Sequence, residues 1–213
     1  MGRKPKSQNE VDDYKTKILD TTLKLISEGG YEAFSIRKLG PTLGIAPKTV
    51  YNYFSSKDEI YLHILTRGFE LLYEDIHRSV QPETDPLKKL ESLARAFASF
   101  GFEKPNYYDL MFTWHVPKFN DFKGTELEPL AFRELQTAMK SFNLLRDILK
   151  EIAIRYGSIP KNDAQTYAIQ LFATIHGIVA LRNNTLINYL HENPDKVVDA
   201  LLEGILVPLR PVE

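Results

Sequence analysis

A short segment near the amino terminus carries side chains that suit contact with nucleic acid. Within five consecutive residues the sequence has Lys48, Thr49, Tyr51 and Asn52, which we call the polar strip. A lysine can bond guanine or phosphate, an asparagine can bond adenine, and a threonine methyl group can contact the thymine methyl group. Tyr51 and the nearby Tyr53 can donate their hydroxyl groups to phosphate oxygens. These residue types favour reading of the DNA major groove, provided that the fold leaves them exposed.

Helical periodicity predicts that the polar strip is exposed. Pro47 suits the first position of a short helix that runs to about Phe54, and helical spacing directs Val50 and Phe54 inward. A preceding short helix begins at Ser35, a residue type that caps helix starts, and Gly44 makes the turn between the two. Two short helices joined by a tight turn and packed on a longer first helix predict a helix-turn-helix motif.

The helix that follows could also hold a phosphate group. Residues Ser56 to Glu59 match a capping box at the start of a long helix over residues 57–80. Lys57 lies in the first turn, where free backbone N–H groups and the positive end of the helix dipole favour anions. The polar strip, the tyrosine hydroxyls and this helix start therefore provide three independent ways to hold a phosphate backbone.

The remainder of the chain also predicts helices. They fall over residues 86–101, 105–115, 127–157, 163–191 and 195–207, and no segment alternates apolar and polar residues over the length of a strand. The predicted fold class is all-α, with about nine helices. We expect a helix-turn-helix domain over residues 1–56 and a helical domain over residues 57–213, linked by the helix over 57–80. Residues 1–10 would form a flexible basic arm, which either contacts DNA or remains a solvated tail.

Composition limits the classes of function. The 213 residues include no cysteine, which disfavours thiolate metal sites and cysteine nucleophiles. No paired-histidine spacing, nucleophile elbow or phosphate loop is present, so we predict no metal site, no cofactor and no enzymatic activity. No segment approaches the roughly 20 apolar residues of a membrane-spanning helix, and the start of the chain does not look like a secretory signal. We therefore expect no membrane partner and a cytoplasmic location.

Charge is distributed unevenly along the chain. The net charge is -1, but residues 1–57 carry +4 and the remainder carries -5. Because screening confines the field of a charge to about 10 Å, local charge attracts a polyanion more than total charge does. The asymmetry suits a protein with one end that faces nucleic acid, and ordinary scatter would also produce it.

Several runs of sequence resemble the DNA-binding domain of the tetracycline-repressor (TetR) family. They are Ala33-Phe34-Ser35-Ile36-Arg37-Lys38-Leu39, Leu43-Gly44-Ile45, Val50-Tyr51-Asn52-Tyr53-Phe54 and Ser56-Lys57. The resemblance covers about residues 11–65. It implies an all-helical homodimer, a palindromic operator in double-stranded DNA, and a C-terminal domain that binds a small organic effector and dimerises.

The polar strip and the resemblance together give the candidate DNA contacts Ser35, Arg37, Pro47, Lys48, Thr49, Tyr51, Asn52, Tyr53 and Lys57. Two positions depart from the family pattern. Gly40-Pro41 stands inside the second helix, where a proline costs about 3 kcal/mol, which predicts a kinked or shortened helix. Ala46 stands at the start of the third helix, where the missing side-chain acceptor costs about 1 kcal/mol.

The C-terminal part is rich in aromatic residues and methionine, which could line an effector pocket or simply form the core of a helical bundle. The candidates are Phe69, Tyr73, Phe97, Phe100, Tyr107, Met111, Trp114, Phe132, Met139, Phe142, Phe172 and His176. We expect His115 and His176 to be interior. Ile175-His176-Gly177 resembles a Trp-His-Gly element of some family members, so His176 is either a hydrogen-bonded structural residue or orients a ligand.

The segment Tyr167 to Leu181 is apolar nearly all round, so a helix there must be covered on several sides. A subunit interface or burial within one chain would both cover it. The resemblance favours a four-helix dimer interface that includes the last helix, with candidate contacts Ile175, Val179, Arg182, Leu186, Val198, Leu202 and Ile205.

These observations predict a DNA-binding transcriptional regulator, and the resemblance implies a repressor that a small, largely apolar effector releases from a palindromic operator. Two alternatives remain: a helix-turn-helix module that binds protein instead of DNA, and a helical enzyme. The protein-binding alternative predicts that alanine at Lys48 or Tyr51 has no effect on DNA binding, because such a module binds no DNA.

Overall fold

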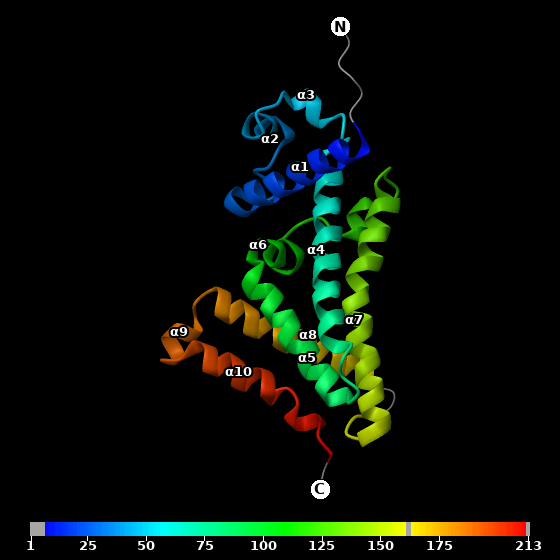
Figure 1. The fold of residues 1–213 in the computed structure, drawn as a ribbon, viewed down its shortest axis with the longest axis vertical. Helices are drawn as coiled ribbons and strands as arrows, with labels where there is room; N and C mark the ends of the chain where they lie inside the picture. Colours follow the sequence, from blue (N-terminus) through cyan, green and yellow to red (C-terminus); the bar gives the residue numbers. More distant parts are fainter. Residues whose placement is uncertain (1–6, 161–162, 212–213) are drawn as a thin grey trace. The chain divides into compact units, whose positions relative to one another are not determined.

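The computed structural model describes residues 7–160 and 163–211, and all of their regular secondary structure is helical, which confirms the all-α prediction. The α-helices in this part of the chain are α1 (Gln8–Gly29), α2 (Ile36–Thr42), α3 (Pro47–Val50), α4 (Lys57–Val80), α5 (Pro86–Glu103), α6 (Pro105–Tyr108), α7 (Glu128–Tyr156), α8 (Ala164–Asn183), α9 (Ile187–Leu190) and α10 (Pro194–Gly204) (Figure 1). A π-helix covers Asp109–Thr113, and short 3₁₀ helices cover Phe119–Phe122 and Val207–Leu209.

Helix α1 begins earlier than expected. Ser7 caps it in a reciprocal arrangement, in which the Glu10 backbone N–H bonds the Ser7 hydroxyl and the Glu10 carboxylate accepts the Ser7 backbone N–H at 2.7 Å. The predicted arm over residues 1–10 therefore overlaps the helix, and its basic residues Arg3, Lys4 and Lys6 lie outside the described residues.

The chain forms two compact units, and neither is a single contiguous segment. Unit 1 comprises residues 1–68 and 109–135, and unit 2 comprises residues 69–108 and 136–213. Helix α4 matches the predicted helix over 57–80 and passes from unit 1 into unit 2, as α7 also does. This division differs from the predicted boundary at residue 56, because residues 57–68 and 109–135 belong with the helix-turn-helix.

Unit 1 has its core where α1, α2 and α3 face one another. Val50 of α3 is completely buried, as the periodicity predicted, and so are Ile18 and Ile26 of α1 and Leu39 of α2. Helix α1 ends where a glycine with positive φ (79°) follows, at Gly30. The short helices α2 and α3 pack against each other, as Figure 1 shows.

The contact between α2 and α3 explains the Gly40-Pro41 pair. A Cβ atom on Gly40 would lie 2.9 Å from both the Ile45 carbonyl oxygen and the Pro47 nitrogen, closer than real side chains allow. The Gly40 carbonyl accepts N–H groups from Leu43 and Ile45. Helix α2 has only seven residues, which agrees with the prediction of a shortened helix, and Pro41 lies exposed within it.

Three predicted helix boundaries are wrong. The helix expected to reach Phe54 ends at Val50, because the following backbone closes i→i+3 bonds, from Asn52 N–H to Thr49 and from Tyr53 N–H to Val50. The helix expected over 105–115 is α6 continued by a π-helix. The helix expected over 163–191 is interrupted between α8 and α9, where Thr185 has a φ of 58°.

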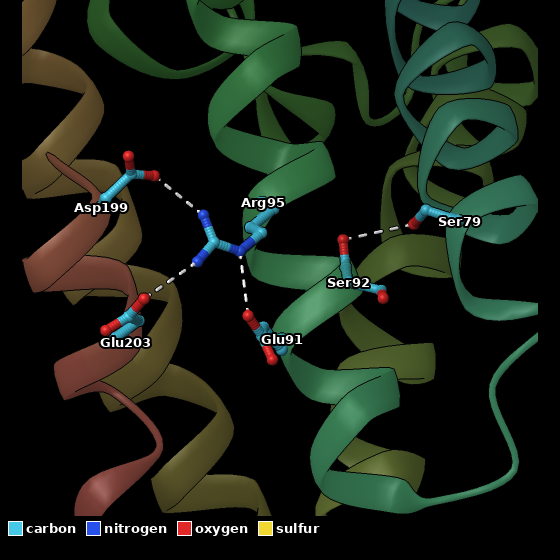
Figure 2. A network of polar contacts seen from close by, with 6 residues as sticks. All are labelled: Ser79, Glu91, Ser92, Arg95, Asp199 and Glu203. Carbon is cyan, nitrogen blue, oxygen red and sulfur yellow. Dashed lines mark hydrogen bonds and ion pairs between the residues drawn. The ribbon is translucent and has the colours of Figure 1, made fainter. Parts of the chain in front are cut away.

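In unit 2, α5, α8 and α10 pack side by side (Figure 1). Arg95 of α5 connects two of them, because its guanidinium bonds Glu91 on its own helix at 3.0 Å and Asp199 of α10 at 2.9 Å, and lies 3.6 Å from Glu203 (Figure 2). In the same view, the Ser79 hydroxyl of α4 donates to the Ser92 carbonyl of α5 at 3.2 Å.

Helix α8 is long and apolar enough to cross a membrane by length and composition, the one such helix in the described part of the chain. The sequence-based statement that no segment approaches such a span was therefore too strong. The helix packs on α5 and α10, and six of its residues are buried, as expected of a central helix in a bundle.

One carboxyl group is buried in unit 1. Glu134 of α7 is 7% exposed, and burial raises its pKa from 4.5 to about 7, while the nearby Lys118 acts in the opposite direction. Tyr61 of α4 is completely buried, and its hydroxyl donates to the Pro117 carbonyl at 2.9 Å. Burial, followed by the charge of Glu134, raises the pKa of Tyr61.

This burial predicts a pH-dependent stability that a Glu134→Gln variant should lack. A carboxyl pKa raised by folding gives stability that is fully present below about pH 4.5 and is lost as the pH rises through about 7. The variant should therefore be more stable than the unsubstituted protein at about pH 8, by about 2–3 kcal/mol, with little difference at about pH 5. Urea unfolding at both pH values measures this, and an equal difference at both would contradict it.

Candidate nucleic-acid interface and effector region

The polar strip lies on the surface of unit 1, and the hydrophobic residues beneath it are buried. Val50 is completely buried and Phe54 is 3% exposed, whereas Tyr51 is 55% exposed. Lys48 and Asn52 are exposed and Thr49 is half-buried. Among the described residues, no hydrogen bond or ion pair engages the side chain of Lys48, Tyr51 or Asn52. The strip is therefore available to a ligand that approaches α3 from solvent.

The other candidates on α2 and α3 occupy defined positions around the strip. Ser35 caps α2, since its hydroxyl oxygen accepts the Lys38 backbone N–H at 3.4 Å, and Arg37 in the first turn is exposed. Pro47 is the first residue of α3 and is half-buried, and Ala46 before it makes no side-chain capping bond, as the sequence indicated.

Tyr53 is half-buried and stacks on α1. Its ring lies parallel to that of Tyr14, with 5.7 Å between the ring centroids. This stacking fixes the position of the backbone that follows the polar strip.

Lys57 is less available for phosphate than the sequence suggested. Its ammonium lies 4.5 Å from the centroid of the Tyr31 ring and 4.0 Å from the Glu32 carboxylate. The start of α4 is also used internally, because the Ser56 hydroxyl accepts the Glu59 N–H at 3.1 Å and Asp58 accepts the Tyr31 hydroxyl.

The expected capping box is thus only half present at this helix start. The Glu59 carboxylate bonds the Ser55 N–H at 2.5 Å instead of that of Ser56. With two acidic residues in the first turn of α4, the positive end of the helix dipole already has carboxylate partners.

The predicted effector residues do not form one set, because they divide between the two units. Met111, Trp114 and Phe132 belong to unit 1, and the other nine belong to unit 2. Phe132 and Met139 are 47% and 38% exposed, so neither lines an enclosed interior. His115 was expected to be interior and is exposed, because it follows the end of the π-helix in an irregular segment.

Four side chains of unit 2 form an aromatic cluster around a polar pair. The Tyr108 hydroxyl bonds Nδ1 of His176, and the two rings stack at 5.4 Å. The Phe97 ring packs edge-on against Tyr108 at 6.1 Å and against Phe172 at 5.8 Å. Burial lowers the pKa of His176, which favours the neutral imidazole.

Tyr108, which is 1% exposed, is the member of this cluster that sequence reasoning missed in favour of its neighbour Tyr107. Helical spacing from Met111 fits both tyrosines, so periodicity could not separate them. Of the remaining unit 2 candidates, Phe69 and Phe100 are buried, Phe142 and Tyr107 are half-buried, and Tyr73 stacks on His77 at 5.5 Å.

The predicted dimer contacts are mostly on the wrong face. Ile175, Val179, Val198, Leu202 and Ile205 are all at most 6% exposed within a single chain. They pack into the core that α5, α8 and α10 share, so they have no surface to offer a second chain. Leu186 is 48% exposed, and Arg182 is half-buried and paired with Asp195 at 3.0 Å.

Comparison with known proteins agrees with this organisation. The family model described as bacterial regulatory proteins, tetR family, matches residues 18–64, which include α2 and α3. The model described as tetracyclin repressor-like, C-terminal domain, matches residues 90–205, more than half of the chain.

Individual relatives are transcriptional regulators. The HTH-type transcriptional repressor KstR of Rhodococcus jostii is 34% identical over 91 residues, which span 43% of this chain and 42% of KstR. The HTH-type transcriptional activator FasR of Mycolicibacterium smegmatis is 22% identical over 91% of this chain and 80% of its own length.

A solved structure shares the fold. The transcriptional regulator FadR of Bacillus subtilis, in complex with stearoyl-CoA, has a TM-score of 0.67 and 20% identity, over 91% of this chain and 98% of FadR. With both family models matched over the two parts of the chain that carry the helix-turn-helix and the C-terminal bundle, the protein belongs to the TetR family of DNA-binding transcriptional regulators.

Proposed function

We propose that this regulator is a homodimeric, effector-responsive repressor that reads a palindromic operator through the polar strip. The observation that carries the proposal is the exposure of Lys48, Tyr51 and Asn52 over the buried Val50 and Phe54. A dimer would present two such strips to successive major grooves, which lie about 34–36 Å apart. Repression is supported by KstR, a repressor and the more similar of the two relatives described, although FasR is an activator. A DNA partner implies a cytoplasmic location.

We propose that the dimer forms through the exposed face of α8 and α10 instead of the buried one. Ile169 and Leu181 of α8 are 54% and 38% exposed, and Leu201 of α10 is 42% exposed. Ala173 lies between the two α8 residues at helical spacing and is also exposed. Apolar side chains in such a row favour a partner helix that removes them from water.

The effector region of the proposal is the aromatic cluster of Phe97, Tyr108, Phe172 and His176. Phenyl rings suit an apolar chain, and the Tyr108–His176 pair could exchange its internal hydrogen bond for one to a polar end group. The fold shared with FadR, solved with stearoyl-CoA, supports a long-chain acyl thioester as the class of effector. Effector binding would favour a dimer in which the two strips no longer match the operator.

The role of Asn52 can be tested by substitution to alanine. Operators are first selected from a random duplex library, and binding is then measured on single-base variants of the selected site. Asn52→Ala should lose discrimination, about 1–3 kcal/mol, at one position in each half-site. Lys150→Ala, which removes an exposed lysine of α7 in unit 2, is the control and should leave binding to every sequence unchanged. A uniform loss of affinity for all sequences in Asn52→Ala would contradict base reading.

The dimer face can be tested with Ile169→Glu. Burying a carboxylate at the interface should shift the protein to monomer in analytical ultracentrifugation and weaken operator binding at least tenfold. Ile154→Glu is the matched control, because Ile154 of α7 is 75% exposed outside this face. A monomer–dimer equilibrium that is the same in both variants would exclude this face as the interface.

The effector class can be tested with stearoyl-CoA and free coenzyme A. Stearoyl-CoA should reduce operator binding at micromolar concentration and free coenzyme A should not, because the apolar chain supplies the affinity. Phe172→Ala should weaken the response to stearoyl-CoA while operator binding in its absence stays unchanged. Equal responses to both compounds would contradict an acyl-chain site.

A further inference from the structure

Unit 1 contains a surface groove that the DNA-binding and effector roles do not use. Two adjoining hollows of about 360 and 400 Å³ share the residues Glu32, Trp114, His115 and Val116 as part of their walls. One side of the groove is the end of α1 and the turn after it, with Gly29 and Gly30, and the other side is the segment 113–118.

The carboxylates of the groove suit a cation. Its walls carry the carboxylates of Glu32 and Asp121 and the ammonium group of Lys118. The Lys57 ammonium lies 4.0 Å from the Glu32 carboxylate, so a cationic ligand would compete with Lys57 for it. The groove also includes the last residue of α1, where backbone carbonyl groups and the negative end of the helix dipole attract positive charge. The last turn of α1 contains no basic residue that would neutralise this end.

The groove also offers an aromatic wall. Trp114 lines both hollows, and indole is the side chain that binds cations most strongly through its ring face. Among the described residues, no cation or other ring contacts Trp114. The neighbouring Tyr31 ring, by contrast, is already covered by the Lys57 ammonium at 4.5 Å.

We propose that this groove is a second ligand site, which binds an organic ammonium cation that carries an aromatic or alkyl group. The ammonium would face Glu32 and the carbonyl groups at the end of α1, and the apolar part would lie on the Trp114 ring. The positive charge of Lys118 repels the ligand cation and limits its affinity. Removal of that charge should therefore strengthen binding.

A ligand in this groove would contact segments that lead directly into the helix-turn-helix. It would contact both the turn that leads from Gly30 to the Ser35 cap of α2 and the segment 113–118, which Tyr61 of α4 holds by its bond to Pro117. All of these residues belong to unit 1, so this site is independent of the aromatic cluster in unit 2.

Trp114 provides the readout, because it is the single tryptophan of the chain. Benzyltrimethylammonium is titrated into the full-length protein at about pH 8, where imidazole groups of ordinary pKa are neutral, with phenylacetate as the anionic comparison. The cation should change Trp114 fluorescence saturably, and phenylacetate should bind more weakly.

Two charge variants should shift the dissociation constant in opposite directions. Glu32→Gln should raise it about two- to fivefold and Lys118→Gln should lower it by a similar factor, as expected for single exposed charges. Glu192→Gln, an exposed carboxylate in unit 2, is the matched control and should leave the constant unchanged. Circular dichroism melting curves check that each variant is folded.

Three outcomes would overturn the proposal. They are a fluorescence change that stays linear with concentration, shifts of the opposite sign in the two charge variants, and calorimetric binding of the cation that persists in Trp114→Ala. None of these bears on operator binding, so failure of this site leaves the proposed repressor function in place.

Discussion

The DNA-reading end of this protein depends on the close approach of two short helices at Gly40. A Cβ atom at this position would lie 2.9 Å from backbone atoms of Ile45 and Pro47. Only glycine therefore allows α2 and α3 to pack this closely. That packing turns Val50 inward, and a helix of four residues with one buried face has only the other face to offer DNA. The exposure of Lys48 and Asn52 follows from this contact and does not require any interaction of their own.

The sequence was sufficient where local chemistry determines the structure. Ser35 and Pro47 each lie at the helix start that their capping or backbone preference indicates, and the inward positions of Val50 and Phe54 follow helical spacing. It was insufficient where the deciding partners are distant in the chain. The sequence around Lys57 does not indicate that Tyr31 and Glu32 contact its ammonium group. Nor does it indicate that residues 109–135 belong to unit 1.

The choice of dimer-contact residues missed the exposed face for a related reason. A helix that is apolar nearly all round gives no periodic signal, so the sequence could not separate the face of α8 that packs on α5 from the face that meets solvent. Ile175 and Ile169 are equally apolar, yet one is 2% and the other 54% exposed. The aromatic residues show the same limit. Their abundance fitted either an effector pocket or a bundle core, and composition could not indicate that Tyr108 instead of Tyr107 contacts His176.

The interleaving of the two units has a consequence for how such proteins can be recombined. The polypeptide crosses between units after Gly68, Tyr108 and Leu135. Unit 1 is therefore assembled from two stretches of sequence, and part of unit 2 lies between them along the chain. A chimera made by one cut after the helix-turn-helix would join a reading surface to a foreign 109–135 segment, including the Pro117 carbonyl that Tyr61 requires. Exchange of specificity between relatives therefore has to transplant both stretches together.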